Sequence, residues 1–114
     1  MSPLHLQLCL KPDQGLVRLS EPELHDNLQL LSQWQLLNEE AVLQREFRFR
    51  DYYQTLAFVN AVGWIAHQQD HHPELLVNYN RCRVRFTTHA VDGISINDLI
   101  CAAKIDQLQD SAEE

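Results

Sequence analysis

Hydrophobic and polar positions along the chain change their period several times, and each change marks an expected element of secondary structure. Three helix starts share one pattern, in which a Ser or Asp cap is followed three residues later by an acidic or amide side chain. They open expected helices at residues 20–31, 51–69 and 95–108. Between the helices the period becomes two, which is typical of half-buried strands. The expected strands cover residues 34–37, 43–50, 76–80 and 81–88.

The order of these elements is α-β-β-α-β-β-α, and it contains no β-α-β unit that would require parallel strands. We therefore predict an α+β fold, a four-stranded antiparallel sheet with three helices packed on one face. Residues 20–114 form a single domain in this prediction, and a turn at residues 38–40 joins the first two strands. Residues 1–19 lack sustained periodicity, so we expect a loosely attached N-terminal arm.

The expected helix at residues 51–69 has more apolar surface than one contact with a sheet needs. An apolar stripe at i, i+4, i+7 spacing is expected to face the core, with three flanking apolar residues beside it. The central residues are Tyr52, Leu56, Val59, Gly63 and Ala66, and the flanking ones are Phe58, Val62 and Ile65. A second stripe is rotated by about a quarter to a third of a turn: Tyr53, Ala57, Asn60 and Trp64. Either a loop or the arm covers this second stripe, or it forms a helix-to-helix contact in a homodimer or homotetramer.

Composition and charge argue against several classes of protein. The 114 residues carry nine Lys and Arg against sixteen Asp and Glu, a net charge of -7. Nucleic-acid phosphates and anionic lipid repel such a chain, and no apolar run approaches the ~20 residues that cross a bilayer. Cys9, Cys82 and Cys101 are odd in number and include no C-x-x-C pair, which favours a reducing compartment. We expect a cytoplasmic protein that binds neither nucleic acid nor membrane.

Histidine carries the chemical signal. Four of the six histidines are His67, His71, His72 and His89. The His71-His72 pair follows an expected helix and His89 ends an expected strand, and chain topology can bring both to one edge of a small sheet. Because imidazoles titrate near ~6.5, such a cluster can hold a proton donor and an acceptor at neutral pH. With no nucleophile elbow, Walker loop or dinucleotide fingerprint, acid/base chemistry is the first hypothesis.

A metal site is the second hypothesis. His67 and His71 are four residues apart, a spacing that places two ligands on one helix face, and His72 or His89 could complete the site. The segment lacks the Glu of an H-E-x-x-H motif, and the helix is expected to end near His71. We therefore favour proton transfer without a metal.

A longer ordered string surrounds the histidines. It consists of Asp70-His71-His72-Pro73-Glu74, Tyr79, Thr88-His89, Gly93-Ile94-Ser95, Asp98 and Ala102. This string resembles the pterin-4a-carbinolamine dehydratase family, over about residues 20 to 108. The resemblance implies the fold predicted above and the dehydration of 4a-hydroxytetrahydropterin to quinonoid dihydropterin in pterin recycling, without metal or organic cofactor. It also leaves open a non-catalytic function, because animal members act as dimerisation cofactors of a transcription factor.

The resemblance also assigns roles to individual residues. His71, His72 and His89 match the family's histidines, and Asp98 matches its acid. We expect His72 and His89 to form the acid/base pair, with His71 binding or assisting. Asp98 is expected to orient the cluster, and it could also cap the last helix, where it stands at the third position. Three further residues are expected to contact the pterin ring: Asp70, Thr87 and Thr88.

Overall fold

Capping side chains set where the helices begin in the computed structural model, which describes residues 3–37, 39 and 41–113. Ser20, Asp51 and Ser95 stand directly before the three helices, as the sequence predicts. The helices are α1 (Glu21–Leu28), α2 (Tyr52–Gln69) and α3 (Ile96–Glu113). Within the described residues, no helix combines the length and apolarity that crossing a membrane requires.

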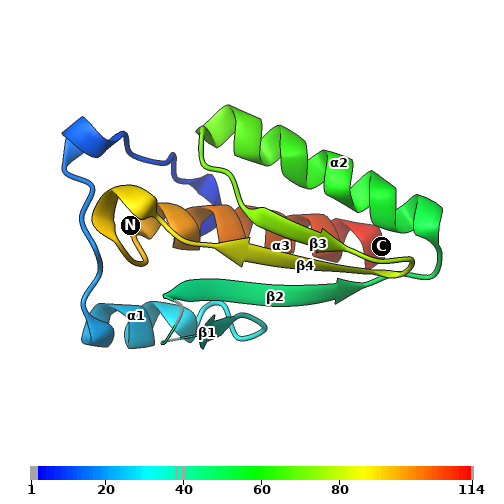
Figure 1. The fold of residues 1–114 in the computed structure, drawn as a ribbon, viewed down its shortest axis with the longest axis horizontal. Helices are drawn as coiled ribbons and strands as arrows, with labels where there is room; N and C mark the ends of the chain where they lie inside the picture. Colours follow the sequence, from blue (N-terminus) through cyan, green and yellow to red (C-terminus); the bar gives the residue numbers. More distant parts are fainter. Residues whose placement is uncertain (1–2, 38, 40, 114) are drawn as a thin grey trace.

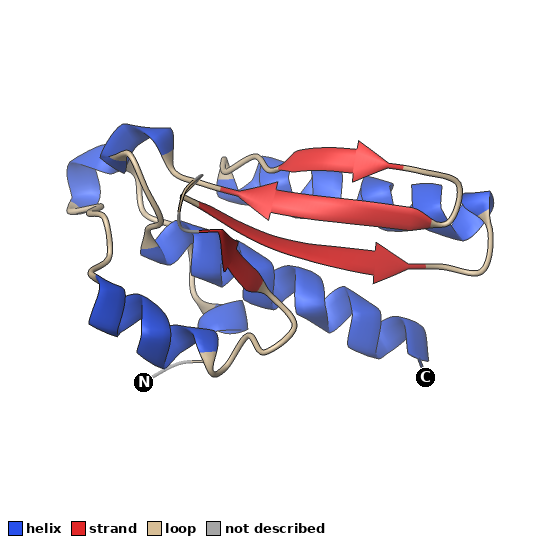
Figure 2. Cartoon of the chain, turned by 60° about the horizontal axis from the view of Figure 1, so that its bottom comes forward, coloured by secondary structure: helices blue, strands red, loops and turns tan. Residues whose placement is uncertain are grey.

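Four strands pair antiparallel in a single sheet. They are β1 (Gln35–Leu37), β2 (Val42–Arg48), β3 (Glu74–Val77) and β4 (Arg81–Phe86). The order across the sheet is β1-β2-β4-β3, so the two longest strands lie at its centre (Figure 1). Figure 2 shows the helices on one side of this sheet. The predicted α+β architecture and element order are confirmed, whereas part of the turn expected at residues 38–40 lies outside the described residues.

Alternation along β4 separates the core from the outer face of the sheet. Cys82, Val84 and Phe86 are buried beneath the helices, at 0 to 1% exposure. The arginines between them face outward, where Arg83 pairs with Glu46 at 3.5 Å and Arg85 pairs with Glu74 at 3.0 Å. Positive charge on this face is therefore partly offset by acids on the neighbouring strands.

The face of α2 that packs on the core includes Ala66 of the predicted stripe but is shifted towards the predicted flanking residues Phe58 and Val62. Its buried residues are Thr55, Phe58, Val62 and Ala66. Tyr52 and Leu56, which the prediction placed in the core, are 49% and 39% exposed. The reason is that Thr55 can be buried without losing its hydrogen bonds, since its hydroxyl lies 2.9 Å from the Asp51 carbonyl and 3.0 Å from the Tyr79 carbonyl.

The N-terminal arm, residues 3–19, is tied to the rest of the fold along its length. The Lys104 ammonium donates a hydrogen bond to the His5 carbonyl, and the Leu19 N–H donates to the Ile94 carbonyl. In Figure 1 the arm runs past the end of α2 and the beginning of α3. It is held more firmly than its lack of periodicity indicated, because backbone groups make these contacts and carry no sequence period.

Candidate active site

One cavity of about 550 Å³ brings His71, His72 and His89 together. We call it the histidine cavity. Asp70 ends α2 in the left-handed conformation, with φ 51° and ψ 44°, and this sharp turn directs His71 and His72 out of the helix. His89 opens the short turn His89–Val91 after β4. The His71-His72 pair and His89, which are expected at one edge of the sheet, therefore line a single cavity.

Asp98 binds His71 from below the cavity. The Nε2 atom of His71 lies 2.6 Å from Oδ1 of Asp98. The Asp98 side chain is fully buried and that of His71 is 11% exposed. The His71 ring also stacks on Phe86, with ring centroids 5.7 Å apart and planes inclined by 6°. His71 is thus fixed on one edge by a carboxylate and on one face by an aromatic ring.

The second oxygen of Asp98 is held by two donors. The Thr88 hydroxyl donates to Oδ2 at 2.6 Å, and the Ser95 N–H donates to the same atom at 2.9 Å. The Ser95 hydroxyl lies 2.7 Å from the Thr88 hydroxyl and extends the network. Asp98 therefore both caps the start of α3 and positions His71. Sequence reasoning treated Ser95 only as a capping residue, and the capping pattern was the signal that pointed to it.

The network changes the proton affinity of His71. Burial by itself lowers the pKa of this imidazole, because a charged ring loses its hydration. The hydrogen bond and charge of Asp98, with smaller contributions from Cys9 and Asp70, outweigh burial and raise the pKa above its ordinary value of 6.5. A larger share of His71 is therefore protonated at neutral pH than of an imidazole in water.

The remaining predicted residues lie around the rim of the cavity. The His72 and His89 side chains are exposed, and Asp70 and Thr87 also line the cavity. Thr88 borders it too, but its hydroxyl already donates to Asp98. The His72 and His89 rings are thus exposed at the cavity, whereas the His71 ring and the Thr88 hydroxyl are already in contact with Asp98.

The N-terminal arm supplies a wall of the cavity that sequence reasoning missed. Its lining residues are Leu8, Cys9, Leu10, Lys11, Pro12 and Leu16. The Asn97 side chain holds this wall with two hydrogen bonds of 2.8 Å, accepting from the Leu10 N–H and donating to the Leu10 carbonyl. The Cys9 N–H donates to Oε1 of Gln69 at 2.9 Å. The contacts join backbone groups of the arm to side chains of α2 and α3, so the arm sequence gave no sign of them.

The two histidines of the alternative metal site, His67 and His71, make different contacts. His67 is absent from the cavity lining, and its ring stacks on Trp64 with centroids 6.0 Å apart. His71 directs Nε2 to Asp98. In the part of the chain that the structure describes, no three His, Cys, Asp or Glu residues have the arrangement of metal ligands.

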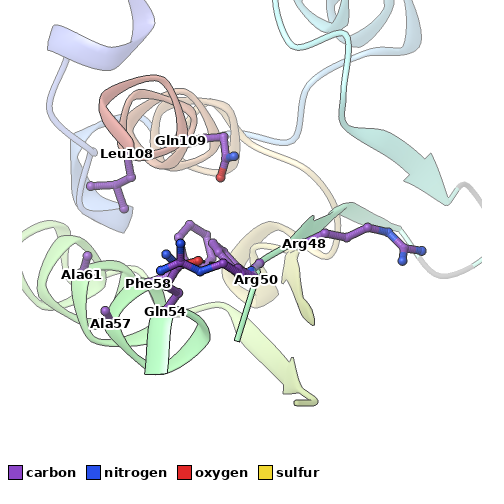
Figure 3. Close-up of a pocket in the computed structure, with 9 residues that line it drawn as sticks. Arg48, Arg50, Gln54, Ala57, Phe58, Ala61, Leu108 and Gln109 are labelled. Carbon is purple, nitrogen blue, oxygen red and sulfur yellow. Dashed lines mark hydrogen bonds between the residues drawn. The ribbon is translucent and has the colours of Figure 1, made fainter. Parts of the chain in front are cut away.

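A second cavity, of about 530 Å³, lies at the other end of α2. Figure 3 shows it between α2 and the last turns of α3, with Phe58, Ala61 and Leu108 around it and the Arg48 side chain pointing away. The described residues that line it include no His, Asp, Glu or Cys. It lacks groups that exchange protons near neutral pH, so the histidine cavity is the candidate active site.

The family model described as Pterin 4 alpha carbinolamine dehydratase matches residues 17–108. The chain belongs to this family. The resemblance noted in the sequence is thereby confirmed, and the matched region contains every predicted site residue, whereas most of the arm lies outside it.

Individual relatives agree with the family match. A protein of Nitrosomonas eutropha is 53% identical over 101 residues, covering 88% of each chain. One of Xanthomonas euvesicatoria is 50% identical over 108 residues, covering 95% of this chain and 92% of its own. Both are named as pterin-4-alpha-carbinolamine dehydratases. A crystal structure from Brucella melitensis, described as a transcriptional coactivator/pterin dehydratase, has a TM-score of 0.77 at 32% identity and covers 80% of this chain and 97% of its own.

Proposed function

We propose that this chain is a carbon–oxygen lyase that converts 4a-hydroxytetrahydropterin to quinonoid dihydropterin and water, in pterin cofactor recycling. The observation that carries this proposal is the histidine cavity itself, which two exposed imidazoles line together with a third that contacts a buried carboxylate. Membership of the pterin 4 alpha carbinolamine dehydratase family and the names of the relatives support the same reaction.

The reaction needs two proton transfers on neighbouring atoms. The 4a-hydroxyl gains a proton and leaves as water. N5 loses its proton, and the electron pair of the N5–H bond forms the C4a–N5 double bond. We assign these transfers to His72 and His89, whose exposed rings can reach a bound molecule. His71 binds or assists as a ring with raised pKa, and Asp98 positions it. No metal or organic cofactor has a part in this scheme.

The pterin ring is proposed to lie between the rim and the arm. Asp70, Thr87 and Thr88 line the cavity beside the histidines and are the proposed contacts to the ring. A carboxylate at Asp70 would accept hydrogen bonds from the amino and N–H groups of a pterin. Apolar residues of the arm, such as Leu8 and Leu10, would cover the ring from the other side.

The deciding experiment measures dehydration of a 4a-hydroxytetrahydropterin by the purified full chain, against the uncatalysed rate. We expect a clear acceleration that is proportional to protein concentration. The Brucella melitensis relative is also described as a transcriptional coactivator. A non-catalytic scaffold of that kind would leave the uncatalysed rate unchanged. The matched control is His67→Ala, since His67 is an exposed histidine of the same helix end that does not line the cavity.

We further propose that the chain acts in the cytoplasm as a homodimer or homotetramer. Tyr53 and Trp64 are 82% and 61% exposed on the outer face of α2, and a second copy of the chain would cover them. Trp64→Glu should lower the assembly state in sedimentation while the helical circular dichroism is kept. Leu30→Glu, at a 73% exposed position beyond α1, should not. An unchanged assembly in Trp64→Glu would place the contact elsewhere.

A further inference from the structure

Two thiols meet where the arm crosses α3. The sulfur atoms of Cys9 and Cys101 lie 3.5 Å apart although the residues are 92 positions apart in the chain. Cys9 is half-buried and lines the histidine cavity, whereas Cys101 is fully buried in α3. A disulfide has an S–S length of about 2.05 Å, so the sulfurs need to approach by only about 1.5 Å to bond.

We propose that Cys9 and Cys101 are a redox-sensitive pair that closes to a disulfide and fixes the arm across the histidine cavity. This modification site goes beyond the dehydration proposed above and does not depend on it. The disulfide acts on the cavity because Cys9 belongs to the same wall that Asn97 holds through Leu10.

The surroundings give the two sulfurs different roles. The hydrogen bond from the Cys101 thiol lowers the pKa of Cys9, and the positive charges of His71 and Lys104 act in the same direction against burial and the charge of Asp98. The same hydrogen bond, together with burial, raises the pKa of Cys101. Cys9 is therefore the thiolate that reacts first, through the cavity, and Cys101 keeps its proton until it resolves the first product.

The chemistry balances with a low-molecular-weight disulfide, RSSR, as oxidant. The Cys9 thiolate attacks one sulfur of RSSR, which forms a Cys9–S–S–R bond and expels RS⁻. Cys101 then attacks the Cys9 sulfur, loses its proton to the expelled thiolate, and releases a second RS⁻, which takes up a proton from water. The two protein thiols lose two electrons and two protons in total, and RSSR becomes two RSH.

Cys82 provides an internal control. It is fully buried on β4, beneath the helices, and burial raises its pKa to about 11. Its thiol is thus both poorly ionised and out of reach of a dissolved oxidant. Oxidation that follows the geometry described above should spare Cys82, whereas indiscriminate oxidation should not.

The experiment treats the purified full chain and three variants, Cys9→Ala, Cys101→Ala and Cys82→Ala, with oxidised glutathione. Wild type and Cys82→Ala should each lose the mass of two hydrogens and yield a peptide that joins Cys9 to Cys101, reversibly on adding dithiothreitol. Cys101→Ala should stop at the Cys9–glutathione mixed disulfide, and Cys9→Ala should not react. Thiols that persist in the wild type, or a stable mixed disulfide there, would overturn the proposal.

Limited proteolysis tests whether the bond fixes the arm. Val17 is 62% exposed, and thermolysin, which cleaves before apolar residues, should cut there. In the reduced protein this cut releases residues 1–16, whereas in the oxidised protein they stay attached until dithiothreitol is added. Release of that fragment from oxidised wild type, at the rate seen for Cys9→Ala, would show that the arm is not fixed. This readout requires no catalytic activity, so its failure is distinct from failure of the dehydratase assay.

Discussion

The raised proton affinity of His71 depends mainly on its contact with Asp98. Burial acts to lower its pKa, and Asp98 supplies the main effect that raises it. In Asp98→Asn the carboxylate is lost while the burial stays, so the pKa of His71 should fall relative to the wild type. The measurement is an NMR titration of the ring protons.

The matched control for this titration is Asp92→Asn. Asp92 is exposed and has φ 54°, a conformation that Asn adopts readily, so this variant removes one acid and leaves the His71 contact intact. The His71 pKa should then stay where it is in the wild type. A pKa that falls equally in both variants would mean that overall charge, rather than the Asp98 contact, sets it.

The same contact makes stability depend on pH in a definite direction. The folded-state pKa of His71 is raised, so its contribution to folding is fully present below the unfolded value of about 6.5 and is lost as pH rises through the folded value. The advantage of wild type over Asp98→Asn in the free energy of unfolding should therefore be larger at about pH 6 than at about pH 8. Urea denaturation at the two pH values measures it, and an advantage that grows with pH contradicts the assignment.

Substitution of His72 or His89 should reduce catalysis while leaving folding intact. Both side chains are exposed, so their removal leaves no buried group without a partner and stability should change little. A positioned acid or base contributes roughly 10²–10⁴ in rate, and each Ala variant should lose an amount of this order while still binding a pterin analogue. The double variant should lose less than the product of the single losses, because groups that serve one transfer act as a unit. Near-wild-type turnover in both single variants would contradict the assignment of His72 and His89 as the acid/base pair.

Among the elements, the arm depends on Asn97 for its place in the wall. Asn97→Ala removes both hydrogen bonds to Leu10, each worth about 0.5–1.5 kcal/mol, so the arm should open roughly ten- to a hundredfold more often. Proteolysis within the arm measures this opening. Gln14→Ala is the control, because Gln14 accepts a hydrogen bond from Lys11 within the arm and does not anchor it. Equal cleavage of both variants would mean that Asn97 does not hold the arm.

The elements also show what the sequence could predict and what it could not. Helix starts and strand alternation depend on neighbouring residues, so Ser20, Asp51 and the inward face of β4 were predictable. The phase of α2 was not, because burial of Thr55 depends on a carbonyl of Tyr79, which lies 24 positions along the chain. On hydrophobicity alone, Tyr52 and Leu56 are expected at the core-facing side of α2.

The candidate site follows the same division. The histidines could be picked from their positions in the chain, and Asp98 from the family resemblance. That Asp98 contacts His71, rather than one of the other imidazoles, depends on how the end of α2 lies over the start of α3. The wall formed by the arm was unpredictable for a related reason, because its contacts use backbone atoms that every residue shares.

For the molecule as a whole, we predict that activity is independent of metal. His71 directs its Nε2 atom to Asp98, and His67 lies outside the cavity beside Trp64. Exhaustive treatment with a chelator should leave the dehydration rate unchanged. A rate that disappears on chelation and returns with zinc would instead favour histidine ligation.

The wall formed by the arm separates two tasks in the chain. The groups proposed to move protons lie within residues 70–98, inside the region that matches the family, whereas the residues facing them from the arm precede residue 17. Substitutions at Leu8, Lys11 or Leu16 can therefore alter the shape and charge of this cavity wall without changing an imidazole or its carboxylate. A lineage could vary which pterin substituents it admits through these positions while inheriting the reaction unchanged.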